Sequence, residues 1–412
     1  MGNQETREKS GNAVLDWFDA RLPVTPFWTN VMTGYYAPKN FNFWYYFGVL
    51  SMVVLVIQLV TGIFLTMNYK PSAAEAFSSV EYIMRDVEWG WLMRYLHSTG
   101  ASFFFIVVYL HMFRGMMYGS YQKPRELIWI LGMLIYLCLA AEAFFGYLLP
   151  WGQMSYWGAQ VIVSLAGAIP VVGDGLVEWV RGDFFISDIT LNRFFALHVV
   201  AVPLILVALV ALHIIALHHV GSTSPDGVEI KENKGPDGVP VDGVAFHPFH
   251  TSKDLIAICL FFIAFFGVVF FAPEAGGYFL EHANFEPANP LKTPEHIAPV
   301  WYFTPFYAIL RAVPDKLGGV LLMGGAMILL FFLPWLDRGK VRSIRYRGWM
   351  FRTALALFVI SFIALGYLGT QPATGVYTRL AQIFTAIYFA FFIFMPIYTK
   401  LDPTKPVPDR VT

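Results

Sequence analysis

Four histidines lie inside long apolar segments, where an ionisable side chain is costly and usually has a function. His97 and His111 share one segment, and His198 and His213 share another. The first pair is 14 residues apart, which in an α-helix puts the rings about 40° apart around the axis and roughly 21 Å apart along it. The second pair is 15 residues apart, or about 60° and roughly 22 Å. We therefore expect His97 to face His198 at one depth and His111 to face His213 at another.

Four glycines are placed to match these histidines. Gly48 and Gly62 lie in one neighbouring segment and Gly132 and Gly146 in another, each pair 14 residues apart. Two facing imidazoles suit an iron ion whose other ligands come from a flat macrocycle, whereas zinc prefers four protein ligands. A glycine removes the side chain where a ring edge must fit, and helix packing alone does not require matched depths. The pattern predicts two stacked b-type haems in a four-helix bundle.

Two arginines flank the histidines of the first segment. Arg94 and Arg114 each lie three residues outside a predicted ligand. Their guanidinium groups suit haem propionates, although arginines at a membrane boundary also extend toward water without any ligand.

The composition requires a membrane around these segments. Of 412 residues, 57% are hydrophobic and 14% are charged, and the mean hydropathy is +0.56. A soluble domain carries about 25% charged residues, so a soluble multi-domain enzyme and a disordered chain are excluded. The 28 acidic and 28 basic residues balance, which argues against a nucleic-acid partner.

Eight apolar stretches are long enough to span a bilayer. They cover approximately residues 43–67, 96–118, 127–149, 191–217, 254–272, 318–336, 349–369 and 376–398. We expect an all-α integral membrane protein with eight transmembrane helices, the first four enclosing two b haems. The apolar stretch 153–166 is too short to span and predicts a helix at the membrane interface.

The chain divides into five regions. We expect a cytoplasmic arm at 1–42, the di-haem bundle at 43–220, a cytoplasmic loop at 221–252, C-terminal helices at 253–400 that include a proline-rich outer loop at 273–317, and a cytoplasmic tail at 401–412. Apart from Arg352, just inside the seventh stretch, the lysines and arginines divide 18 to 9 in favour of the side that holds both termini. Basic loops stay in the cytoplasm, so both termini are predicted there.

Several sequence motifs resemble those of the cytochrome b family of the respiratory cytochrome bc complex, in its bacterial form. They are GASFFFIVVYLHMFRGMMYGSY at 100–121, GYLLPWGQMSYWGAQVI at 146–162, FHPFHTSKD at 246–254, PVWYFTPFYAILRAVPDKLGG at 299–319 and PW at 334–335. The resemblance implies a quinol–cytochrome c oxidoreductase subunit of the bacterial inner membrane. It also implies a Rieske iron–sulfur partner, a cytochrome c-type subunit and a homodimeric complex.

The family works by a Q cycle. Ubiquinol is oxidised at the outer face, one electron goes to the Rieske protein, and the other crosses the membrane to reduce quinone at the inner face. The resemblance assigns the low-potential haem to His97 and His198 and the high-potential haem to His111 and His213.

Residues for the inner quinone site follow from the same resemblance. His218 lies five residues beyond His213, and Lys253 and Asp254 open the fifth span. A protonatable histidine and aspartate can supply the protons that quinone reduction needs. The alternative is that they are interfacial polar residues.

The outer quinol site is expected to include Tyr147, the 153–166 helix and the segment 295–307, with Tyr302 and Tyr307 shaping the pocket. In the family, the motif at the position of residues 299–302 is usually Pro-Glu-Trp-Tyr, and its glutamate is a proposed proton acceptor. This chain has Val300 at that position, and valine cannot carry a proton.

Two other carboxylates are candidates for the proton acceptor that Val300 cannot provide. Glu295 lies five residues upstream of Val300, and Glu142 lies one helical turn before Gly146. We expect Glu295 to take the role, with Glu142 as the second candidate.

A second departure is the 15-residue spacing between His198 and His213, where the respiratory form commonly has 14. Pro203 is expected to kink the helix and absorb the extra residue.

Two other classes stay open. One is a di-haem membrane anchor of another quinone-linked dehydrogenase, or a ferric reductase, although no glycine-rich nucleotide fingerprint occurs. The other is a haem-free transporter, which would have helices broken at mid-membrane.

Overall fold

The computed structural model describes residues 12–29, 31 and 34–412, and the remainder of the predicted arm lies outside the described residues. Within the described part, eight helical segments are long and apolar enough to cross a membrane, as the sequence predicts. They cover Phe43–Thr66, Gly90–Met117, Glu126–Leu148, Asp188–Val220, Phe246–Phe271, Lys316–Leu336, Trp349–Gly369 and Gly375–Ile393.

Most of these segments are built around a single long helix. The long helices are α3 (Phe47–Thr66), α5 (Gly90–Met117), α6 (Glu126–Leu148), α10 (Val202–Val220), α11 (Thr251–Phe271), α13 (Lys316–Ile328), α15 (Trp349–Gly369) and α16 (Gly375–Ile393). The shorter helices are α1 (Ala13–Asp19), α2 (Val24–Trp28), α4 (Ala76–Arg85), α7 (Gln153–Leu165), α8 (Gly173–Arg181), α9 (Asp188–Ala196), α12 (Thr304–Arg311), α14 (Leu333–Leu336) and α17 (Met395–Leu401).

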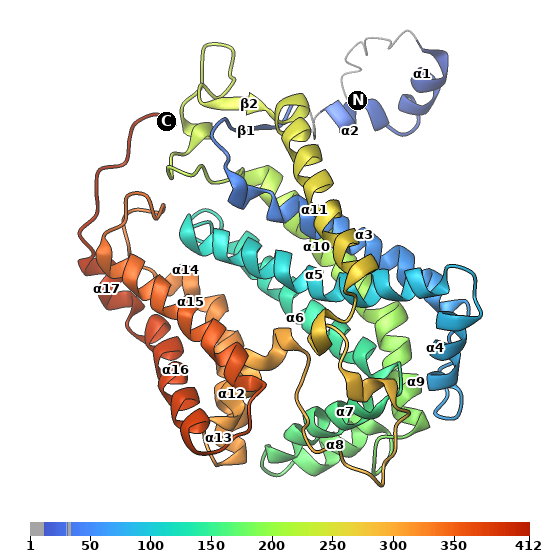
Figure 1. Ribbon diagram of the computed structural model, residues 1–412. Helices are drawn as coiled ribbons and strands as arrows, with labels where there is room; N and C mark the ends of the chain where they lie inside the picture. The colour runs from blue at the N-terminus through green and yellow to red at the C-terminus, as the bar shows by residue number, and fades with distance from the viewer. Residues whose placement is uncertain (1–11, 30, 32–33) are drawn as a thin grey trace.

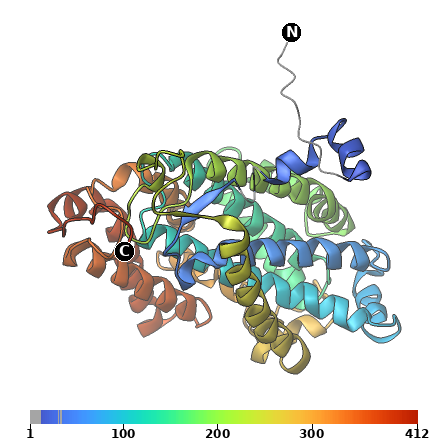
Figure 2. The same cartoon turned by 90° about the horizontal axis from the view of Figure 1, so that it is seen from above.

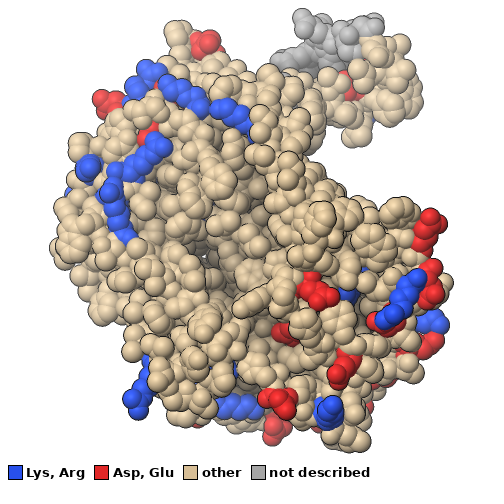
Figure 3. Space-filling view, viewed as in Figure 1, with Lys and Arg blue, Asp and Glu red and all other residues tan. Residues whose placement is uncertain are grey.

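The two ends of the molecule differ (Figure 1). One end carries the C-terminus and a two-stranded antiparallel sheet of β1 (Tyr36–Pro38) and β2 (Gly243–Ala245), in which Tyr36 pairs with Ala245. The opposite end carries α7 and α8. We call the first the inner end and the second the outer end, following the predicted orientation. Between them, Figure 3 shows a broad zone almost free of charged side chains, as contact with lipid requires.

The first four spans pack as two helix pairs. α3 packs on α5, and α6 packs on α10. A second group consists of α12, α13, α15 and α16, in which α12 and α16 both pack on α15. Figure 1 shows this group beside the bundle.

The fourth span contains a π-helical turn at Leu197–Ala201. There the N–H of Val202 donates to the carbonyl oxygen of Leu197, five residues earlier. A π-turn holds one more residue than an α-turn. Pro203, which lacks an N–H, comes two residues after the end of the turn. The extra residue between His198 and His213 is therefore accommodated in this π-turn, beside the proline where a kink was predicted.

The connections at the outer end are compact. The stretch predicted as an interfacial helix is α7, which ends at Leu165, and α8 follows without having been predicted. The proline-rich loop contains only short 3₁₀ turns, at Ala275–Gly277, His282–Phe285 and Trp301–Phe303, before α12. Short helices α1 and α2 lie within the predicted arm and stand apart from the helical body (Figure 2).

Ion pairs join the loops of the inner end. The Arg125 guanidinium donates to both carboxylate oxygens of Glu229, with an Nη2–Oε2 distance of 2.8 Å, and Arg342 pairs with the same carboxylate. Arg345 pairs with Asp226 at 2.8 Å. Arg342 and Arg345 thus tie the loop at 221–252 to the loop that precedes α15, and Arg125 ties it to the start of α6. A further pair, between Arg410 and Asp242 at 2.7 Å, ties it to the C-terminal tail.

Candidate functional site

The two predicted histidine pairs form across the bundle. The ring centres of His97 and His198 lie 6.1 Å apart, and the ring planes are 86° to each other. The ring centres of His111 and His213 lie 6.4 Å apart, with an angle of 69°. α5 supplies one ring of each pair, while the π-turn and α10 supply the others.

The separation of each pair fits one metal ion between the rings. A metal–nitrogen bond of about 2.0–2.1 Å, with about 1.1 Å from each nitrogen to its ring centre, requires ring centres about 6 Å apart. Two imidazoles do not complete the coordination of a zinc ion, but they complete that of a haem iron.

The four predicted glycines each face one of these rings. A Cβ atom added at Gly48, Gly62 or Gly132 would lie 3.3 Å from the Cε1 atom of His111, His97 or His213, respectively. At Gly146 the added atom would lie only 2.4 Å from Cε1 of His198. Each histidine is thus approached by a helix surface without a side chain, so the residues present fit a flat macrocycle at both depths.

The outer pair has side-chain partners that the inner pair lacks. The Thr61 hydroxyl lies 2.9 Å from Nδ1 of His97. Nδ1 of His198 lies 3.0 Å from Oε1 of Glu142 and 2.9 Å from the main-chain oxygen of the same residue. Among the described residues, no side chain hydrogen-bonds Nδ1 of His111 or His213. The two depths therefore offer different electrostatic environments.

The two predicted propionate-binding arginines lie at the two ends of α5. Arg94 is in its second turn, and Arg114 is in its last turn. The Arg114 guanidinium lies 4.7 Å from the ring centre of Tyr45 and donates to the Ser120 hydroxyl at 3.2 Å. Its Nε atom is buried, and no hydrogen-bond partner for it occurs in the described part of the chain, which leaves a donor for an anion.

The predicted inner-site residues lie at the inner end. The ring of His218 packs on Tyr35 at 4.5 Å, and Tyr35 packs on Phe246, just before α11. Lys253 and Asp254 lie in the first turns of α11, and both are half-buried. The Lys253 ammonium lies 4.1 Å from the ring centre of Phe249. The structure brings these residues to the same end of the bundle as His213.

Two cavities lie at the outer end. The smaller, of about 20 Å³, is apolar and lies between α6, α7 and the loop before α12; Tyr147, Pro299 and Val300 are among its lining residues. The larger, of about 380 Å³, is lined by Glu281, His282 and His296, among others. Pro299 lines both cavities, so they are neighbours.

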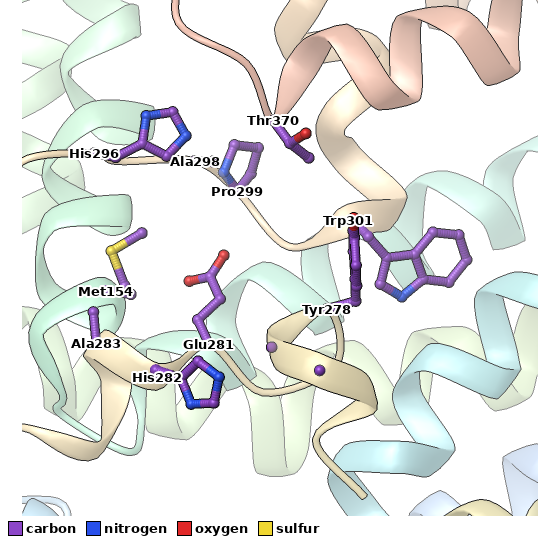
Figure 4. Close-up of a pocket in the computed structure, with 12 residues that line it drawn as sticks. Met154, Tyr278, Glu281, His282, Ala283, His296, Ala298, Pro299, Trp301 and Thr370 are labelled. Carbon is purple, nitrogen blue, oxygen red and sulfur yellow. The ribbon is translucent and has the colours of Figure 1, made fainter. Parts of the chain in front are cut away.

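A hydrogen bond links the two linings. The hydroxyl of Tyr147 donates to Oε2 of Glu281 at 2.6 Å. Figure 4 shows the Glu281 side chain pointing from its loop toward the segment that carries Pro299. Burial raises the pKa of the Glu281 carboxyl, and the hydrogen bond from Tyr147 lowers it in part. This carboxyl therefore holds a proton at a higher pH than a free glutamate does.

The predicted pocket tyrosines occupy different positions. Tyr302 is buried and stacks on Phe105 with ring centres 3.9 Å apart. The Tyr307 hydroxyl donates to the carbonyl oxygen of Ile297 at 3.2 Å, which ties α12 to the segment before Val300. Val300 itself is buried and contributes an apolar wall to the smaller cavity.

The two carboxylates predicted for the proton role do not line either cavity. Glu295 is exposed, whereas its neighbour His296 lines the larger cavity. Glu142 faces His198 instead. Glu281 was missed by sequence reasoning because its partner Tyr147 is 134 residues away and the loop around it has no periodicity. A carboxylate in an apolar, glycine-rich stretch was the only local signal.

Comparisons with known proteins agree with this geometry. The family model described as cytochrome b/b6/petB matches residues 32–221, and the model described as cytochrome b (C-terminal)/b6/petD matches 287–389. Cytochrome b of Allochromatium vinosum is 62% identical over 98% of this chain and 99% of its own length. Cytochrome b of Rhodospirillum rubrum is 49% identical over 99% and 98%. A chain of a hyperthermophilic respiratory complex III has a TM-score of 0.87 at 42% identity, covering 94% of this chain and 99% of that chain.

Proposed function

Because the chain belongs to the cytochrome b family, we propose that it carries out transmembrane electron transfer in a Q cycle as the catalytic membrane subunit of a quinol–cytochrome c oxidoreductase. It oxidises ubiquinol at the outer end and gives one electron to a Rieske iron–sulfur partner. The other electron crosses the bundle to quinone at the inner end. The observation that carries this proposal is the two facing histidine pairs, which lie on the same two spans toward opposite ends of one bundle.

His97 and His198 would hold one b-type haem, and His111 and His213 would hold the second. When bound, the two haems supply one-electron redox centres at two depths of the membrane. The glycines facing the rings leave room for them.

The outer centre is proposed to have the lower potential. A hydrogen bond from Nδ1–H of a ligating histidine to a carboxylate raises the basicity of the ligand, and a more basic ligand favours the oxidised metal. Glu142 places a carboxylate oxygen 3.0 Å from Nδ1 of His198, while its main-chain oxygen is the hydrogen-bond partner of that nitrogen. No side chain of the described residues hydrogen-bonds Nδ1 of either histidine of the inner pair. The difference supports a low-potential centre at His97 and His198 and a high-potential centre at His111 and His213.

The protein's own residues handle the protons. At the inner end, His218 and Asp254 are proposed to deliver protons to the reduced quinone, and Lys253 contributes positive charge. At the outer end, Tyr147 is proposed to contact the quinol, while Tyr302 and Tyr307 keep the pocket in shape. Release outside and uptake inside add to the proton gradient.

The cellular location and the partner proteins follow from the same proposal. The chain is a multi-pass membrane protein, and the excess of basic residues at the inner end supports a bacterial inner-membrane protein with both termini in the cytoplasm. The proposed partners are the Rieske protein, a cytochrome c-type subunit and a second copy of this chain in a homodimeric complex.

A redox titration of the purified complex tests the proposal. We expect two b-type signals with different midpoints, loss of the lower one in His198→Asn and loss of the higher one in His213→Asn. Ubiquinol-dependent reduction of cytochrome c should fall in both variants. No haem in the wild type would indicate a transporter, and haem without ubiquinol oxidation would indicate a membrane anchor.

A further inference from the structure

The apolar outer cavity has one route for protons among its lining residues. Tyr147 is the titratable side chain in the lining, which otherwise consists of apolar groups, glycine and Ser155. Oxidation of a quinol releases two electrons and two protons, and the Val300 side chain cannot accept a proton. Tyrosine is a weak acid, with an ordinary pKa of about 10. It does not hold an extra proton, but it can pass one on if its hydroxyl has an acceptor.

Glu281 is that acceptor. Its Oε2 atom lies 2.6 Å from the Tyr147 hydroxyl, which is within hydrogen-bond distance. Tyr147 lines the smaller, apolar cavity, and Glu281 lines the larger one. The pair therefore connects the lining of the smaller cavity, which includes the proposed quinol contact Tyr147, to the space of about 380 Å³ beside it.

We propose that Glu281 accepts the proton that leaves the quinol through Tyr147. This inference rests on the proposed function. The quinol hydroxyl gives a proton to the Tyr147 oxygen while the Tyr147 hydroxyl gives its own proton to the Glu281 carboxylate, so the tyrosine ends neutral. Glu281 then releases the proton to water in the larger cavity. The other quinol proton would leave with the electron taken by the iron–sulfur partner. The second electron would go to the b-type haem that His97 and His198 would hold, so two electrons and two protons leave the quinol.

The other two carboxylates are less suited to this step. Glu295 is exposed and outside both linings. Glu142 places Oε1 at 3.0 Å from Nδ1 of His198, so its charge acts on the histidine. Glu281 alone of the three contacts a side chain that lines the apolar cavity.

The groups around Glu281 set its affinity for protons. Tyr147 donates to it from α6, and Tyr302 is within its electrostatic reach. His296, His282 and Tyr278 line the same cavity. Burial raises the pKa of the carboxyl above its usual value, which makes it a stronger base than an exposed glutamate.

Arg94 on α5 is within electrostatic reach of Tyr147 and of Glu274, which lies in the same loop as Glu281. This positive charge favours the transient loss of a proton from the tyrosine hydroxyl.

Glu281→Gln in the complete complex tests the step. The general base is lost, so we expect ubiquinol oxidation to fall on the order of 10²-fold in kcat. In the wild type the rate should rise with pH as Glu281 ionises, and this rise should disappear in the variant. Glu281→Asp should restore part of the rate and the pH dependence. Glu286→Gln, an exposed position in the same loop, serves as the matched control and should keep wild-type values.

Tyr147→Phe gives an independent readout. Because the two residues act in series, Glu281→Gln combined with Tyr147→Phe should be no slower than the slower single variant. Unchanged b-type spectra and midpoints in each variant show that the bundle is intact.

Three outcomes overturn the proposal. They are a Glu281→Gln complex within twofold of the wild-type rate with the same pH profile, a Glu295→Gln complex that loses the rate instead, or a fully additive double variant. If Glu281→Gln does not assemble, Glu281→Asp decides through its pH profile. Failure of the proposed function itself is a separate result, because it appears in the wild type as absent haem or absent ubiquinol oxidation.

Discussion

Oε1 of Glu142 lies 3.0 Å from Nδ1 of His198, and the main-chain oxygen of the same glutamate lies 2.9 Å from that nitrogen. One residue of α6 thus offers two acceptors to one proposed ligand. The side-chain acceptor carries charge, and the main-chain acceptor does not. The two contributions can therefore be separated by changing the side chain alone.

Glu142→Gln is expected to raise the midpoint of the lower-potential b-type centre. Removing the carboxylate makes His198 a less basic ligand, and we expect a rise on the order of 60 mV, which corresponds to about 1.4 kcal/mol for one electron. The main-chain acceptor stays, so haem should still bind. A redox titration measures both midpoints, and the higher one serves as the internal control. An unchanged lower midpoint would contradict the assignment of this carboxylate.

Gly146→Ala is expected to reduce haem binding at the outer histidine pair more than Gly132→Ala reduces it at the inner pair. The added methyl group would lie 2.4 Å from Cε1 of His198, against 3.3 Å from Cε1 of His213. The first contact is shorter than packed atoms tolerate, and the second requires only a small adjustment. Haem content and the two b-type signals of the purified variants provide the measurement. Equal losses at both depths would show that the clearance does not matter.

Glu229→Gln is expected to destabilise the inner end. The change leaves the buried Arg125 without its anionic partner, and breaking such a pair costs about 3–5 kcal/mol. The thermal unfolding midpoint of the purified protein at neutral pH should fall. Glu232→Gln, an exposed position in the same loop, is the control.

The same pair predicts a pH dependence. Burial raises the pKa of Glu229, but Arg125 and Arg342 lower it more, so the folded value lies below the ordinary 4.5. A depressed folded pKa gives stability that is complete above the unfolded pKa and is lost as the pH falls through the folded value. The difference in unfolding midpoint between wild type and Glu229→Gln should therefore shrink as the pH drops below 4.5. A constant difference across that range would refute this account.

Deletion of Val200 tests the π-turn. This exposed residue lies inside Leu197–Ala201, and its removal allows the turn to close as an α-turn. We expect His198 and His213 to keep their relative orientation, so both b-type signals should remain. An alanine inserted after Val210, in the regular part of α10, would rotate His213 by about 100° and should abolish the higher-potential signal. Loss of both signals in the deletion variant would show that the π-turn is required.

The helical part of the site could be predicted from sequence because helix geometry is local. The separation of His97 and His111, and the matching separation of Gly48 and Gly62, follow from a fixed rise and rotation per residue. The structure places these four residues as that arithmetic requires.

The other parts of the candidate site depend on contacts between residues far apart in the sequence, which no local sequence pattern encodes. Thr61 reaches His97 from a neighbouring helix, and Glu281 reaches Tyr147 from an irregular loop. The position of Glu142 inside a span makes it a candidate for the proton role, but the direction of its side chain, toward His198, depends on helix packing and not on its position in the chain. The kink expected at Pro203 proved to be adjacent to a π-turn, because an extra residue in a helix can be absorbed by widening one turn.

The ion pairs of Glu229 and Asp226 also determine what the loop at 221–252 does. Arg125 comes from the N-terminal half of the chain, whereas Arg342 and Arg345 come from the C-terminal half. The loop therefore connects the two halves of the chain through ion pairs as well as through its peptide bonds. The peptide bonds within it are not the sole connection, and a chain cut between Asn233 and Val241 would leave Glu229 and Asp226 still holding both pieces together.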